Sequence, residues 1–142
     1  FGSRLMKKVR EEKGYTYGIY SLMVPLVNEG YLTIASEVGA NVCRKALKAI
    51  EEEIKKLRTE KVEQQELDMV RNYMMGQLLR AFDGPLPTAS AYMGLMEMGL
   101  KEDYYQRVVY TINNITPEDV LQLAGKYLDE QTMIRSVAGK CE

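Results

Sequence analysis

Residues 9–21, VREEKGYTYGIYS, change from one kind of pattern to another within a few positions. The first half is rich in charge and ends at Lys13-Gly14, a cation for a last helical turn followed by a residue suited to a left-handed stop. From Tyr15 onward, aromatic and β-branched residues predominate, as in strands. The stretch therefore predicts a helix, capped near Ser3, that ends at a glycine and leads directly into a strand.

Two strand-like runs, residues 15–24 and 31–38, flank the turn signal Asn28-Glu29-Gly30. Together they predict a β-hairpin. The alternation of apolar side chains changes phase near Gly18, where an extra residue in one strand would fit. We therefore expect a β-bulge at that position.

Helical periodicity begins after Gly39 and dominates most of the remaining chain. The start signal Thr116-Pro117 is followed by two acidic residues, as at a helix N-terminus. Helices are expected over about 42–57, 63–82, 88–99, 101–113 and 117–128, and a last strand over 132–137. This order predicts an α+β fold with two layers, an antiparallel sheet with helices packed on one face, formed by residues 1–142 as a single domain.

Composition excludes several classes of function. The chain has 142 residues, a formal net charge of −1 and no histidine. A near-neutral charge offers no field that attracts nucleic acid, and no apolar run approaches the roughly 20 residues needed to span a bilayer, so neither partner is expected. Without histidine, Ser-His-Asp and Cys-His catalytic units and histidine zinc sites are excluded. The compartment is left open.

Several side-chain groups have ordinary structural interpretations. Three adjacent glutamates at 51–53 precede lysines at helical spacing, which favours a solvated helix face over a metal or acid/base site. Five methionines at 74, 75, 93, 96 and 98 favour core packing over a binding groove. Cys43 and Cys141 are interpreted as small, partly buried residues, and a disulfide between them stays open.

Arg10 and Tyr17 are the exception, because a tight glycine corner could bring their tips together. Considered alone, Arg10 complements a helix C-terminus and Tyr17 is a half-buried strand tyrosine. The longer stretch, however, resembles the start of the second half of pitrilysin/insulinase-family zinc peptidases, related to mitochondrial processing peptidase. The residues that match are Ser3-Arg4-Leu5, Arg10-Glu11, Gly14 and Tyr17, with weaker matches at 66–79 and 115–120.

The resemblance implies one of two related α+β halves that enclose a chamber, of which only the other half bears the zinc motif H-x-x-E-H. This chain lacks that motif, and it also lacks the strand and helix that precede the match in the family, so it resembles a truncated C-terminal half. The implied partners are a zinc-bearing N-terminal half or subunit, a peptide substrate and a second copy of the chain. No cofactor is expected in this chain, and zinc is expected in the partner half.

The resemblance also assigns a role to Arg10 and Tyr17, which have the family's seven-residue spacing. When zinc-bound water attacks a peptide carbonyl, negative charge develops on the oxygen, and a phenol and a guanidinium can stabilise it. Both residues are therefore candidate catalytic contacts in a metalloendopeptidase. Two alternatives remain: a non-catalytic structural or assembly subunit of the same family, and an independent ligand-binding α+β module.

Overall fold

The computed structural model describes residues 2–142 and divides them into two compact units. The first unit contains residues up to 25, residues 29–60 and residues 122–142. The second contains residues 26–28 and 61–121. Each unit is described by itself.

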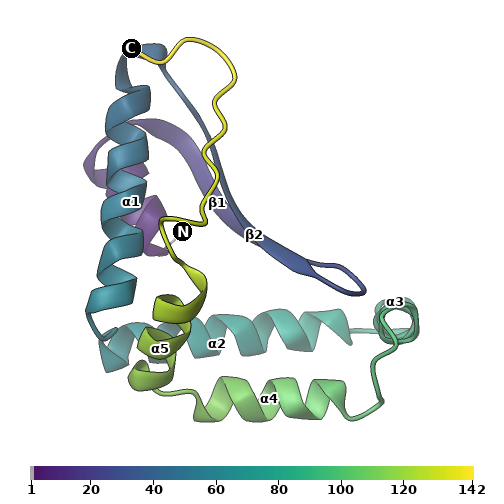
Figure 1. Ribbon diagram of the computed structural model, residues 1–142. Coiled ribbons are helices and arrows are strands. Elements are labelled where there is room, and N and C mark those ends of the chain that lie inside the picture. Colours follow the sequence, from purple (N-terminus) through teal and green to yellow (C-terminus); the bar gives the residue numbers. More distant parts are fainter. Residues whose placement is uncertain (1) are drawn as a thin grey trace. The chain divides into compact units, whose positions relative to one another are not determined.

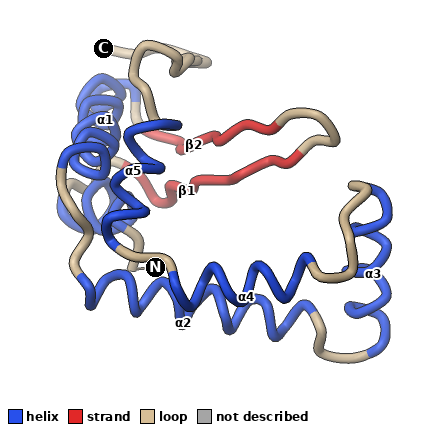
Figure 2. The backbone as a smooth tube through the Cα atoms, turned by 60° about the horizontal axis from the view of Figure 1, so that its bottom comes forward, coloured by secondary structure: helices blue, strands red, loops and turns tan. Residues whose placement is uncertain are grey.

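The first unit contains a short helix, a β-hairpin and one long helix (Figure 1). In chain order its elements are the π-helix η1 (Met6–Glu12), the strands β1 (Thr16–Pro25) and β2 (Gly30–Val38), the short 3₁₀ helix η2 (Ala40–Val42) and the helix α1 (Cys43–Thr59). The antiparallel hairpin β1–β2 is the sheet of the described residues, drawn in red in Figure 2. The prediction of an α+β fold is confirmed.

The first helix begins and ends as predicted, but its backbone is wider than an α-helix. The hydroxyl of Ser3 accepts a hydrogen bond from the Met6 amide at 3.3 Å, and Gly14 takes a left-handed φ of 63°. Between them, η1 is a π-helix. Apolar spacing in so short a segment does not distinguish 3.6 residues per turn from the wider winding, so the sequence indicated only a helix.

The core of the first unit forms where η1, the hairpin and α1 meet. Val9 is fully buried, and Ile19, Ala46 and Ala49 join it in one cluster. Partly buried side chains surround this cluster, namely Leu5, Met6, Tyr15, Ile34, Val38 and Ile50. Small alanines on α1 let this helix approach η1 closely, so the end of η1 that leads into β1 is anchored against α1.

The predicted last strand is wrong. Residues 132–137 have no strand structure, and the apolar side chain of Ile134 is 95% exposed. A cavity of about 510 Å³ is lined by residues 31–34 of β2, by α1 and by residues 132–136. A strand requires a neighbouring strand for its backbone hydrogen bonds. Residues 132–136 line the cavity together with part of β2, but they do not pair with β2 in the sheet.

The second unit is helical. Its elements are α2 (Gln64–Ala81), α3 (Pro85–Glu97), α4 (Tyr104–Asn114) and the first residues of α5 (Pro117–Tyr127). Helices α2 and α4 lie side by side (Figures 1 and 2). The rings of Phe82 and Tyr105 meet edge to face with centroids 4.7 Å apart, and Leu67, Leu95 and Ile112 are buried.

The helices of the second unit bury less apolar surface than their sequences predict. Of the expected inner face of α2, Leu67 is buried, but Val70 and Met74 are exposed. Met93 and Met96 on α3 are also exposed, so the prediction that the methionines fill a core is wrong for Met74, Met93 and Met96. Apolar periodicity identified the helices correctly, but it does not reveal how much of an apolar face the chain covers.

The N-terminus of α5 confirms the predicted start signal. The Asp119 carboxylate accepts hydrogen bonds from the Thr116 hydroxyl at 2.7 Å and from the Thr116 amide at 2.8 Å. The Thr116 hydroxyl in turn accepts one from the Asp119 amide at 3.2 Å. This reciprocal arrangement satisfies amide groups that a helix end leaves without intrahelical partners.

These hydrogen bonds predict a pH dependence of stability. They lower the pKa of Asp119, chiefly through the Thr116 hydroxyl and then through the Thr116 amide. Because the folded pKa lies below the unfolded value of about 3.9, the stabilisation is complete above that value and is lost as the pH falls through the folded pKa. In Asp119→Asn, the free energy of unfolding should therefore fall less steeply with acidification than in the wild type. Denaturant titrations from pH 5 to pH 2.5 measure this slope, and equal slopes would contradict the prediction.

Candidate functional site

Arg10 lies in the last turn of η1, next to a fully buried side chain. Its neighbour Val9 is 0% exposed, which fixes the backbone of this turn against the core. The carbonyl groups of both residues are used: Gly14 donates to the Arg10 carbonyl and Tyr15 to the Val9 carbonyl, each at 3.0 Å. The backbone that presents the half-buried Arg10 side chain is therefore held in place on either side of the glycine corner.

Tyr17 lies in a β-bulge. Thr16 pairs with Val38 and Ile19 pairs with Ser36, so two residues of β1 stand opposite one residue of β2. The predicted bulge is confirmed, and it contains Tyr17 and Gly18. An extra residue turns the local side chains out of the regular alternation. The Tyr17 side chain is 97% exposed, so it projects into solvent with almost no packing around it.

Two hydroxyl groups fill the hydrogen-bonding gaps that the bulge leaves. The hydroxyl of buried Thr16 lies 2.6 Å from the Glu37 carbonyl oxygen, to which it donates, and it accepts from the Gly18 amide at 3.1 Å. Ser36 donates to the Gly18 carbonyl oxygen at 2.9 Å and lies equally close to the Thr16 hydroxyl. Neither role was predicted from the sequence, although hydroxyl side chains beside a glycine at which the alternation changes phase are a usable signal.

The structure thus places Arg10 and Tyr17 on adjoining ends of η1 and β1, anchored by the buried Val9 and Ile19. Without the family resemblance, the sequence predicts that Tyr17 is half-buried. This prediction is wrong, because the ring is exposed. A phenol that faces solvent on a fixed corner can donate a hydrogen bond to an external acceptor, and a guanidinium nearby in the chain can add charge-assisted bonds.

The expected solvated face of residues 51–53 needs a correction. Glu53 is only 6% exposed, and its carboxylate accepts a hydrogen bond from the Lys56 ammonium group at 2.7 Å. Glu53 follows the buried Ala49 by four residues and comes directly before the buried Ile54, so it lies on the buried side of α1. Its lysine partner offsets the cost of burying its charge. Glu51 pairs across the surface with Arg135 at 2.6 Å.

The described residues 2–142 do not fit a zinc ion. They contain no cluster of three or more His, Cys, Asp or Glu side chains that could bind a metal.

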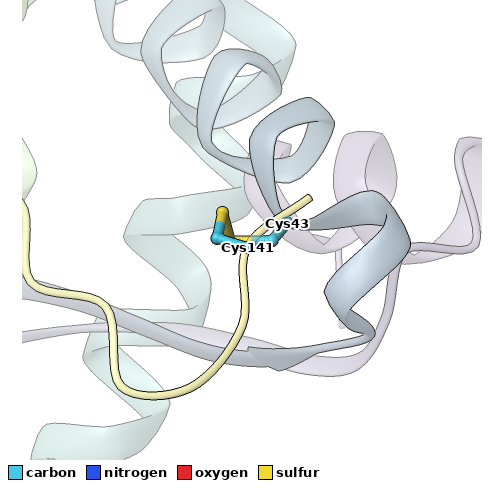
Figure 3. Close-up of a disulfide and its surroundings, with 2 residues drawn as sticks. All are labelled: Cys43 and Cys141. Carbon is cyan, nitrogen blue, oxygen red and sulfur yellow. A yellow bond between two sulfur atoms is a disulfide. The ribbon is translucent and has the colours of Figure 1, made fainter.

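The two cysteines, whose pairing the sequence left open, are joined in a disulfide between Cys43 at the start of α1 and Cys141 (Figure 3). None of the helices in the described part of the chain is long and apolar enough to cross a membrane.

The fold and the corner define an α+β domain whose described residues, 2–142, contain no metal-binding cluster. Residues 1–74 match the family model of the peptidase M16 inactive domain, which is more than half of the 142 residues. The chain therefore belongs to the peptidase M16 inactive domain family. This membership confirms the resemblance to the second half of pitrilysin/insulinase-type zinc peptidases.

Relatives and solved structures agree with this assignment. The chain is 29% identical over 129 residues to the uncharacterized zinc protease YmxG of Bacillus subtilis (strain 168), and the match covers 90% of this chain and 31% of that protein. A crystal structure of a peptidase M16 inactive domain from Pseudomonas fluorescens has a TM-score of 0.81 at 25% identity, and the match covers 91% of this chain and 31% of that one. An inactive peptidase domain from Bordetella parapertussis shares the fold, with a TM-score of 0.72 at 14% identity over 88% of this chain and 70% of that one. The chain thus spans about a third of the length of the first two proteins.

Proposed function

We propose that this chain is the substrate-binding, zinc-free C-terminal part of a zinc metalloendopeptidase that cleaves peptides or unfolded segments. In this proposal Arg10 and Tyr17 contact the carbonyl group of the substrate. The observation that supports it best is the exposure of Tyr17 on a corner whose backbone is fixed by buried neighbours. An exposed aromatic ring without packing contributes little to the fold, so its position favours contact with something outside the chain.

The chemistry of the two side chains suits a developing negative charge. When a nucleophile attacks a peptide carbonyl, the oxygen becomes an oxyanion, and donors already in position stabilise it more than they stabilise the ground-state carbonyl. The phenol of Tyr17 supplies one neutral donor. The guanidinium of Arg10 supplies charged donors that can also hold carbonyl groups of the substrate before reaction.

The rest of the catalytic machinery has to come from elsewhere. The chain has no histidine, and residues 2–142 hold no metal-binding cluster. We therefore place the metal and the general base in a zinc-bearing N-terminal half, on the same polypeptide or on a partner chain. The family membership supports this division. Pairing with a second copy, and folding of residues 1–142 as one domain, stay predictions.

Replacing Arg10 by alanine in the zinc-bearing protease tests the proposal. Arg10→Ala should lower kcat/KM by about 10- to 100-fold with a raised KM, because a charge-assisted hydrogen bond contributes about 1.5–3 kcal/mol. Lys13→Ala is the matched control, since it removes an exposed cation after the same helix and should leave kcat/KM unchanged. Steady-state kinetics on an unstructured peptide, with zinc content and melting temperature measured alongside, provide the readout.

Two results would contradict the proposal. One is a value of kcat/KM in Arg10→Ala within about twofold of the wild type at equal zinc content. The other is an assembled protein that contains this chain, binds no zinc and cleaves no peptide. The second result would favour the alternative of a structural or assembly subunit.

A further inference from the structure

We propose that Thr16 and Ser36 are positioning residues for Tyr17, whose hydroxyl groups hold the bulge in the conformation that presents the phenol. This inference rests on the proposed function of Tyr17. It starts from a contrast between the side chain and its backbone. The Tyr17 ring is 97% exposed, whereas Thr16 before it and Ile19 after it are buried.

The exposure of Tyr17 means that packing does not orient its ring. A core tyrosine is held by its neighbours, but this one has almost no contact with the chain. The direction in which its side chain leaves the backbone therefore depends on the backbone conformation of Tyr17 and Gly18. Anything that fixes this bulge also fixes the place from which the phenol reaches the substrate.

Regular ladder bonds do not fix the bulge. Paired positions stop at Thr16 and resume at Ile19, so the two residues between them lie outside the ladder. The backbone of Gly18 is also unconstrained by a side chain of its own. Its φ is not in the left-handed range, and a Cβ atom there would meet nothing within 4 Å.

The two hydroxyl groups provide the missing constraints, and each has one hydrogen to donate. In one consistent arrangement, Thr16 donates to the Glu37 carbonyl at 2.6 Å and accepts from the Gly18 amide at 3.1 Å. Ser36 then donates to the Gly18 carbonyl at 2.9 Å. Both backbone groups of Gly18, and the Glu37 carbonyl opposite the bulge, are thereby satisfied by side chains from both strands.

Thr16→Val tests the inference, because it keeps the branched shape of threonine and removes the hydroxyl. In the zinc-bearing protease we expect kcat to fall about tenfold with little change in KM. Thr16→Ser keeps the hydroxyl and should restore kcat to within about twofold of the wild type. Thr33→Val is the matched control, since it makes the same change in the regular part of β2, opposite Leu22 and away from the bulge.

A double substitution shows whether Thr16 acts through Tyr17. If it does, Thr16→Val combined with Tyr17→Phe should be no slower than Tyr17→Phe alone, within about twofold. If the double variant instead lowered kcat by the product of the two separate reductions, Thr16 would act on the fold independently of Tyr17. That result would overturn the inference. If Thr16→Val does not fold, Ser36→Ala takes its place in the same comparison, because it removes one of the two hydroxyl groups that lie within 2.9 Å of the Gly18 carbonyl oxygen.

Hydrogen exchange separates failure of this inference from failure of the proposed function. In the assembled protease, the Gly18 amide should exchange at least tenfold faster in Thr16→Val and return to the wild-type rate in Thr16→Ser. If Tyr17→Phe has no effect on kcat but Gly18 exchange responds as expected, the hydroxyl groups do hold the bulge and the proposed role of Tyr17 is wrong. If Gly18 exchange does not respond to Thr16→Val, the inference itself is overturned.

Discussion

Replacing Tyr17 by phenylalanine should lower the kcat of the proposed zinc-bearing protease by about 10²- to 10³-fold, corresponding to about 3 to 4 kcal/mol, the loss typical of removing one oxyanion donor. The ring remains and only the donor is removed. Since the side chain is almost fully exposed, the substitution should leave the melting temperature unchanged. KM should change little, because the hydrogen bond contributes most in the transition state.

A tyrosine on the same strand provides the control for this prediction. Tyr20 is also exposed on β1, but it lies after the bulge in the regular ladder. Tyr20→Phe removes an equivalent hydroxyl and should leave kcat unchanged. Single-turnover kinetics on a peptide substrate would isolate the chemical step. Equal rates for the wild type and Tyr17→Phe would remove Tyr17 from the catalytic contacts, whereas equal losses in both variants would indicate a general effect on the strand.

The local features of the corner could be predicted from sequence because each has a local physical cause. Gly14 adopts a left-handed φ that other residues rarely adopt, so it marks the end of η1. The change in alternation at Gly18 required an extra residue in one strand, and the register contains it. The Thr116-Asp119 cap also involves only neighbours in the chain. Such signals do not depend on the rest of the fold.

The missed features depend on contacts between distant parts of the chain. Ser36 meets Thr16 only after the hairpin has formed, so its role in the bulge is visible in the register and not in the local sequence. Glu53 looked solvated beside other charges, but helix α1 turns it toward the buried side, where Lys56 pairs with it. Charge at a position does not by itself determine its exposure.

The segment after α5 shows the same limit for strands. Residues 132–137 have β-branched and apolar residues that favour a strand, yet the sheet of the described residues contains only β1 and β2. Strand propensity becomes structure only where another strand accepts the backbone hydrogen bonds. The proposed role of Arg10 and Tyr17 came from the family resemblance, because composition and spacing alone also fit a helix-end charge and a half-buried strand tyrosine.

The disulfide should be the largest single contribution to the stability of this chain. It joins Cys43 to Cys141 across 98 positions, tying the segment after α5 to the beginning of α1 (Figure 3). A cross-link over about 100 residues removes much of the freedom of the unfolded chain, which corresponds to about 4 to 5 kcal/mol in the chain-entropy description. Whole domains are stable by only about 5–15 kcal/mol, so loss of this bond should remove a large fraction of the total.

The double substitution Cys43→Ala and Cys141→Ala should therefore lower the free energy of unfolding by about 4 kcal/mol in denaturant titrations. Treating the wild type with a dithiol reductant should have the same effect, and the double variant should not respond to the reductant. The control is Arg135→Ala, which breaks the exposed ion pair between the same segment and Glu51. Exposed ion pairs contribute about 0.2–1 kcal/mol, so that variant should remain close to the wild type. Reduction of the wild type could instead change its free energy of unfolding by less than about 1 kcal/mol. In that case the segment after α5 would be held by its other contacts. The disulfide would then not restrict the unfolded chain as the separation of its two cysteines implies.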